Sequence, residues 1–160
     1  MSAKRLFQFL VFFLLSAFCF GEQSFALSID QLRIGVHPGK TRLVLDLSEK
    51  SDFKIFLMAE PYRLVVDLPD FQWHAGPFQG ARGSGVRALR YGPLQNGVSR
   101  IVMDLDKPMS VGAAFLLPKG SGQPDRLVID FAPSNDARFH ADLAKSYGFL
   151  AGERVEQLEI

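Results

Sequence analysis

Four hexapeptides of one pattern decide how this chain folds: Arg42-Leu43-Val44-Leu45-Asp46-Leu47, Arg63-Leu64-Val65-Val66-Asp67-Leu68, Arg100-Ile101-Val102-Met103-Asp104-Leu105 and Arg126-Leu127-Val128-Ile129-Asp130-Phe131. Each reads arginine, apolar, valine, apolar, aspartate, apolar. Side chains alternate between the two sides of a strand. The arginine, valine and aspartate therefore share one side, and the other apolar residues share the opposite side. The pattern predicts four half-buried β-strands.

The hexapeptides belong to a larger repeat that occurs twice. Leu32-Arg33-Ile34-Gly35 precedes the first hexapeptide, and Leu89-Arg90-Tyr91-Gly92 precedes the third. The residues by which the second copy is longer fall in loops that contain glycine and proline. Two copies of one unit therefore make up the domain.

Each unit adds two more strands to its hexapeptides. We expect a strand before the first hexapeptide of each unit (31–36 and 87–91) and one between the two hexapeptides (53–58 and 111–117). Short strands separated by turns predict an all-β sandwich or a closed sheet. Residues 69–85 form the crossover loop between the units.

After Phe131 the pattern changes to apolar residues at a spacing of four. Residues 136–147 are predicted to form a short helix or the start of a linker. Asn135 is its expected N-cap, and Gly148 is its expected stop.

The first 26 residues have the features of an export signal. Lys4 and Arg5 precede an apolar run over residues 9–20, and Ser24 and Ala26 are the small residues of a cleavage site. We predict a signal peptide cleaved after Ala26 and a periplasmic location, with the secretory route favoured over twin-arginine export. The apolar run is too short for a retained membrane anchor, which needs about 20 apolar residues.

Charge and composition exclude several classes of protein. The 160-residue chain has 18 basic and 17 acidic side chains, with a net charge of +1. Nucleic-acid binding needs a clear basic excess, so we expect no nucleic-acid partner. The single cysteine lies in the leader, which excludes disulfides and thiolate metal sites in the mature chain. The three histidines are scattered, and no metal site is expected.

The repeat resembles the AMIN domain, through the doubled Arg-Leu-Val-x-Asp-Leu pattern, the Leu-Arg starts of both units and the leader. AMIN is the non-catalytic module ahead of the zinc-dependent catalytic domain in bacterial N-acetylmuramoyl-L-alanine amidases, and it also occurs in type IV pilus secretins. The resemblance implies an internally duplicated two-sheet β-sandwich over 27–133, with repeats at about 29–70 and 86–133. Residues 134–160 would then be a helix or linker toward a catalytic domain.

The resemblance also implies a function. The first hypothesis is a non-catalytic, periplasmic, peptidoglycan-binding module that targets a cell-wall amidase to the division septum. The second is that the chain is the front of the zinc-dependent amidase itself, with zinc and catalysis in a domain after Ile160. The third is an interaction module of a secretin-type envelope complex. For this chain we expect no cofactor, and peptidoglycan with division-site or envelope proteins as partners.

The candidate binding residues are the arginines, because a planar guanidinium grips a stem-peptide carboxylate with two parallel hydrogen bonds. They are Arg33, Arg42, Arg63, Arg90, Arg100 and Arg126. The alternative is that the hexapeptide arginines pair across strands with Asp46, Asp67, Asp104 and Asp130. That alternative directs attention to Arg33 and Arg90, which have no obvious acidic partner. Trp73 and Tyr91 are candidates for stacking on sugar rings, although packing is favoured for Trp73.

Overall fold

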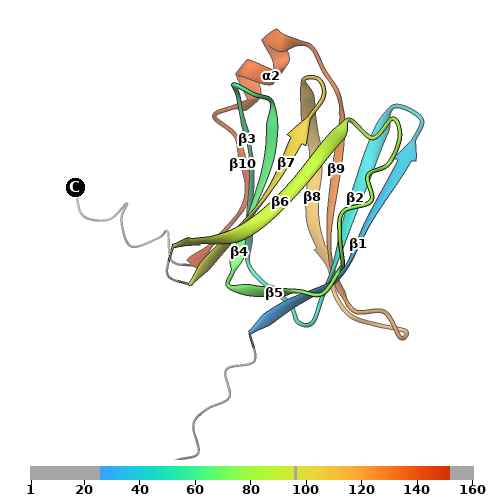
Figure 1. The fold of residues 1–160 in the computed structure, drawn as a ribbon, viewed down its shortest axis with the longest axis vertical. Helices are drawn as coiled ribbons and strands as arrows, with labels where there is room; N and C mark the ends of the chain where they lie inside the picture. Colours follow the sequence, from blue (N-terminus) through green and yellow to red (C-terminus); the bar gives the residue numbers. More distant parts are fainter. Residues whose placement is uncertain (1–25, 96, 152–160) are drawn as a thin grey trace, which may run out of the picture.

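All four hexapeptides form strands, and each strand lies inside a sheet rather than at its edge. The computed structural model describes residues 26–95 and 97–151. Its elements are β1 (Leu27–His37), β2 (Lys40–Leu47), β3 (Phe53–Met58), β4 (Arg63–Pro69), β5 (Phe71–Trp73), β6 (Val86–Gln95), β7 (Val98–Leu105), β8 (Met109–Leu117), β9 (Asp125–Pro133), α2 (Asp136–Asp142) and β10 (Ser146–Phe149). They form two sheets packed as a sandwich (Figure 1). The predicted two-sheet all-β fold is confirmed. The predicted signal peptide lies outside the described residues, apart from Ala26.

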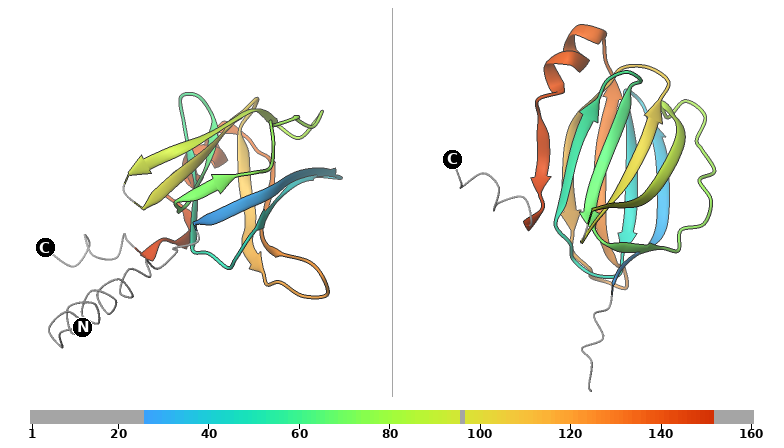
Figure 2. Two further views of the ribbon diagram at one scale, coloured as in Figure 1. Left: turned by 60° about the horizontal axis from the view of Figure 1, so that its bottom comes forward. Right: turned by 60° about the vertical axis from the view of Figure 1, so that its left-hand side comes forward.

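Each half of the chain contributes one hairpin to each of the two sheets. One sheet has the strand order β5-β1-β2-β9-β8 and the other β10-β3-β4-β7-β6. The first half thus contributes β1-β2 to one sheet and β3-β4 to the other, and the second half contributes β8-β9 and β6-β7. Figure 2 shows the resulting two layers. We call the outer surface of the sheet containing β1 face A, and that of the sheet containing β3 face B. Each face is built from both halves.

The core comes from the apolar positions of the hexapeptides. All twelve side chains at the second, fourth and sixth positions are at most 2% exposed: Leu43, Leu45, Leu47, Leu64, Val66, Leu68, Ile101, Met103, Leu105, Leu127, Ile129 and Phe131. Full burial of such a side chain stabilises the fold by about 1.5–3 kcal/mol. A slip of one residue would turn these side chains out and the charged ones in, so the core also sets the strand register.

The crossover loop contains a strand that the sequence pattern does not predict. β5 pairs in parallel with the start of β1. Trp73 in β5 stacks on Tyr91 in β6, with ring centroids 4.3 Å apart and planes 16° from parallel, and its Nε1 donates to the Gly76 carbonyl at 2.7 Å. The stacked pair joins one edge of the two sheets.

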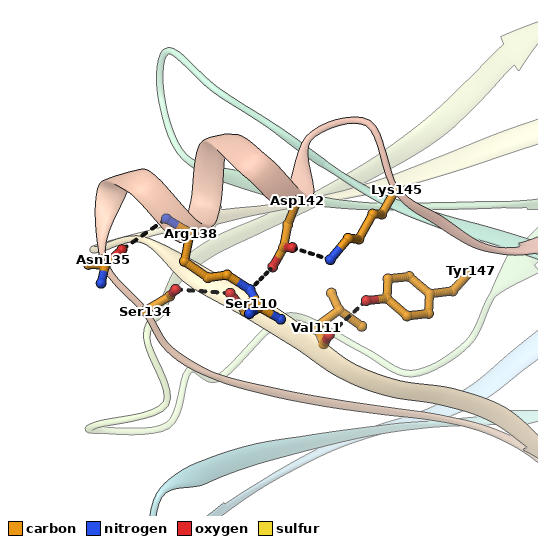
Figure 3. Close-up of polar contacts among 8 residues, drawn as sticks. All are labelled: Ser110, Val111, Ser134, Asn135, Arg138, Asp142, Lys145 and Tyr147. Atoms are coloured by element: carbon orange, nitrogen blue, oxygen red, sulfur yellow. Dashed lines mark hydrogen bonds and ion pairs between the residues drawn. The ribbon is translucent and has the colours of Figure 1, made fainter.

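The helix after β9 is shorter than the sequence predicts. Asn135 is the N-cap as predicted, and its side chain accepts from the Arg138 amide at 2.9 Å (Figure 3). The helix ends at Asp142, however, and residues 146–149 pair antiparallel with β3. The expectation of a helix through Tyr147 is wrong because the open edge of β3 offers backbone hydrogen bonds to this stretch. Gly148, with φ of 72°, lies within β10 and does not end a helix.

α2 lies at one end of the sandwich, at the top of Figure 1, and β10 runs from there along the edge of the sheet beside β3. Phe139 of α2 is fully buried, and its ring meets Tyr62 edge-on at 4.8 Å. The Tyr147 hydroxyl donates to the Val111 carbonyl at 2.8 Å, which links β10 to β8 in the other sheet (Figure 3). The segment is therefore packed against both sheets.

A buried carboxylate holds the turn between α2 and β10. The side chain of Asp142 is only 3% exposed and accepts from Lys145 Nζ at 2.7 Å and Arg138 Nε at 3.2 Å (Figure 3). The hydrogen bond from Lys145 is the largest cause that lowers the pKa of Asp142 to about 2, followed by those from Ser110 and Arg138, against the opposing effect of burial. The ionised carboxylate therefore stabilises this turn.

Candidate functional site

Both faces of the sandwich carry the same set of charged residues. Each has three arginines and two aspartates on neighbouring strands, placed there by the alternation of the hexapeptide and by the strand register. Face A carries Arg33, Arg42, Arg126, Asp46 and Asp130, and face B carries the corresponding Arg90, Arg100, Arg63, Asp104 and Asp67. The structure thus gathers all six candidate arginines and all four aspartates into two matched clusters.

One ion pair in each cluster joins the two halves of the chain. Arg42 of β2 donates to both carboxylate oxygens of Asp130 of β9, at 2.7 Å each. Arg100 of β7 does the same to Asp67 of β4, at 2.6 and 2.8 Å. The cross-strand pairing considered from the sequence is correct for these two arginines.

The carboxylate of Asp130 is held ionised. The Arg42 hydrogen bond is the largest cause that lowers the pKa of Asp130 to about 2, with a smaller contribution from Lys40 Nζ at 3.1 Å, against the effect of burial. Asp130 is therefore a structural anchor for Arg42.

The remaining aspartates bind the arginines that precede the hexapeptides. Asp46 pairs with Arg33, and Asp104 accepts from Arg90 Nη1 at 2.6 Å. The expectation that Arg33 and Arg90 lack an acidic partner is wrong. Arg33 lies opposite Val44 in the register, so Asp46 is its diagonal neighbour, within reach of a long side chain. The tight Pro38-Gly39 turn is the sequence signal that could have shown this register.

These diagonal pairs displace the third arginine of each face. Arg126 lies directly opposite Asp46, and Arg63 lies directly opposite Asp104, but both carboxylates already bind another arginine. Three guanidinium groups therefore meet two carboxylates on each face. Each cluster thus has one guanidinium group more than it has carboxylates.

Apolar side chains lie beside both clusters. Phe56 on face B lies under Arg100 and Lys54, whose cationic groups are 5.3 and 5.8 Å from the ring centroid. Its counterpart Phe115 is 36% exposed on face A, as is Leu117. Trp73 and Tyr91, the candidates for sugar stacking, lie at the sheet edge outside both clusters and stack on each other.

Face A also contains a shallow groove of about 320 Å³. Its lining includes the three arginines of the face together with His37, Val44, Leu117 and Val128. The sequence reading did not single out His37 or Leu117 as site residues. Leu117 lies opposite Arg126 in the β8–β9 register, so the strand alternation around the fourth hexapeptide is the signal that could have found it.

Within the described ranges, 26–95 and 97–151, no three His, Cys, Asp or Glu side chains come together at a spacing that could hold a metal ion. No helix there is long and apolar enough to cross a membrane.

The fold and its faces define a duplicated β-sandwich that presents two matched arginine–aspartate clusters on opposite surfaces. The family model of the AMIN domain matches residues 31–131, and the chain belongs to this family. AMIN domains are non-catalytic, bind peptidoglycan in amidases and secretins, and occur in periplasmic proteins. A search of curated proteins finds no match to this chain.

Proposed function

We propose that this chain is a periplasmic module that binds peptidoglycan through faces A and B and targets a cell-wall amidase to the division septum. The observation that carries the proposal is the surplus arginine on each face, three guanidinium groups against two carboxylates. Peptidoglycan repeats carboxylates along its stem peptides, and arginine is the side chain best suited to bind them. The near-neutral chain attracts this polymer through the placement of its arginines.

The position of the two clusters favours binding to a network. Faces A and B lie on opposite sides of the sandwich, as the two layers in Figure 2 show. A domain held between neighbouring stem peptides could use both faces at once. Two linked contacts raise the overall affinity well above that of either one.

A sacculus pull-down with residues 27–151 tests peptidoglycan binding. We expect the wild-type domain to sediment with purified sacculi, and the double variant Arg63→Ala/Arg126→Ala to stay largely in the supernatant. Arg82→Ala/Arg87→Ala is the matched control, because it also removes two positive charges, from exposed positions outside both clusters. Wild-type protein that stays in the supernatant, or equal losses in the control, would refute the proposal.

The amidase role and the septal location need separate experiments. In the proposed parent protein, zinc and catalysis belong to a domain encoded after Ile160. Sequencing past that codon tests this, and a stop codon there refutes it. A fluorescent fusion of the leader and domain should collect at division sites. Uniform fluorescence around the envelope would contradict septal targeting.

A second candidate is an interaction module of a secretin-type envelope complex. The observation in its favour is the apolar pair Phe115 and Leu117, which is exposed on the edge strand β8. In that case an envelope protein should co-purify with the wild-type domain and be lost from a Phe115→Ser/Leu117→Ser variant. The wild-type domain should then not sediment with purified sacculi.

A further inference from the structure

The two faces differ in what their surplus arginine does. On face B, Arg63 donates to the carbonyl oxygens of Ala59 and Pro61, at 3.2 and 3.3 Å. On face A, Arg126 has no hydrogen-bond or ion-pair partner among the described residues, and its Nε is buried without an acceptor. The unpartnered buried atom on face B is instead an acceptor, Asp104 Oδ1. The surplus guanidinium of face A is therefore uncompensated, whereas that of face B is partly compensated by backbone carbonyl groups.

The cause lies in the loop that precedes each arginine. The short β3–β4 turn brings its own carbonyl groups back onto Arg63. The β8–β9 loop before Arg126 is longer, and the carbonyl groups of Gly120 and Gln123 each accept from the other residue's amide, at 2.9 and 3.1 Å. Among the described residues, no carbonyl of that loop accepts a hydrogen bond from Arg126.

The groove on face A supplies the rest of a binding site. Arg126 lines it together with Val44, Val128 and Leu117, and Arg33 and Arg42 lie beside them. Its volume of about 320 Å³ is at the small end of ligand sites, which is room for one or two residues of a peptide. A charged guanidinium beside apolar walls fits a carboxylate that carries a small apolar substituent.

We propose that this groove binds the terminal carboxylate of a peptide that ends in a small apolar residue, with Arg126 gripping the carboxylate. Naming the stem peptide of peptidoglycan as its source rests on the proposed function above. A singly charged carboxylate matches the one guanidinium of face A, that of Arg126, that has no partner among the described residues. A phosphate dianion fits less well, because the carboxyl groups of Asp46 and Asp130 lie close by, in their pairs with Arg33 and Arg42.

The test is a calorimetric or NMR titration of the domain with diacetyl-Lys-D-Ala-D-Ala and with the same peptide as its C-terminal amide. We expect the acid to bind the wild-type domain at least tenfold more tightly than the amide. Arg126→Ala should weaken binding of the acid at least tenfold. Arg63→Ala, the matched variant on face B, should change it less than twofold. Arg126 has no partner to lose, so circular dichroism and the melting temperature should stay unchanged in Arg126→Ala.

Three results would overturn the assignment: no detectable binding of the acid at millimolar concentration, equal binding of acid and amide, or equal losses in Arg126→Ala and Arg63→Ala. The pull-down separates this failure from that of the proposed function. Sacculi that retain the domain while the acid does not bind would refute the carboxylate groove and leave peptidoglycan binding intact. Binding of the acid with no retention on sacculi would refute peptidoglycan binding and leave the carboxylate groove intact.

Discussion

Phe139→Ala should destabilise the whole domain, although Phe139 lies outside the stretch that defines the family. Its side chain is fully buried, in a helix that follows the matched residues 31–131. Replacing a buried phenylalanine by alanine costs about 3–5 kcal/mol, through lost burial and the cavity that remains. The edge-on contact with Tyr62 at 4.8 Å contributes about 0.5–1.5 kcal/mol beyond burial where such pairs are measured. We therefore expect a loss in the upper part of the 3–5 kcal/mol range.

Urea unfolding followed by Trp73 fluorescence measures this loss. Trp73 is the only tryptophan, and it lies in β5 at the opposite end of the sandwich from α2 (Figure 1). A change in its transition therefore reports global unfolding. For a domain of this size a loss of 3–5 kcal/mol lowers the melting temperature by roughly 10–20 °C.

Phe115→Ala is the matched control for this prediction. Phe115 is 36% exposed, and its truncation should cost about 1 kcal/mol or less. A loss below about 1 kcal/mol for Phe139→Ala would refute the reasoning, because α2 would then be a dispensable appendage. An equal loss in both variants would show that burial at the end of the sandwich is not the cause.

Three further predictions concern single contacts. Gly148→Ala should release β10 from β3, because a Cβ there would collide with the Phe53 carbonyl. Gly76→Ala is the control: it has the same φ of 72° and no atom within 4 Å of the added Cβ, so it should cost only the backbone penalty of about 1–2 kcal/mol. Faster hydrogen exchange of the β10 amides in Gly148→Ala alone would distinguish the two variants. Because the pKa of Asp142 is lowered in the folded state, its carboxylate stabilises the fold above about pH 4, and this stabilisation is lost as the pH falls toward 2. In urea titrations, Asp142→Asn should therefore lower the free energy of unfolding by about 1–2 kcal/mol at pH 7 and by little at pH 2. Asp67→Ala should cost about 1–3 kcal/mol in the same assay, since it removes the buried carboxylate that accepts two hydrogen bonds from the partly exposed Arg100. A loss under about 0.5 kcal/mol would contradict that role.

The strands and their faces are predictable because the hexapeptide contains its own periodicity. Apolar residues at alternate positions can be buried only on one side of a strand, so the core and the two charged surfaces follow without any tertiary information. The N-cap at Asn135 is predictable for a similar reason, since its side-chain oxygen acts within its own helix turn.

The neighbours of each strand are not predictable from the same pattern. Any two hexapeptides placed antiparallel bring arginine opposite aspartate, so a β2–β4 pair satisfies the pattern as well as the observed β2–β9 pair. The partners of Arg33 and Arg90 depend on diagonal contacts, which follow from the register of the hairpins. β10 forms because the edge of β3 is available for pairing, and the residues of β10 carry no pattern that predicts this pairing.

Because each sheet contains one hairpin from each half of the chain, both charged faces depend on the duplication. The bidentate pairs Arg42–Asp130 and Arg100–Asp67 both join one half to the other, so neither half alone can build a face. The duplication therefore produces one body with two faces, and selection on one hexapeptide alters only one face. The surplus arginine comes from the second half on face A and from the first half on face B. Because the clusters are otherwise matched, the loop before Arg63 or Arg126 decides whether that arginine is compensated internally or left to bind an anion.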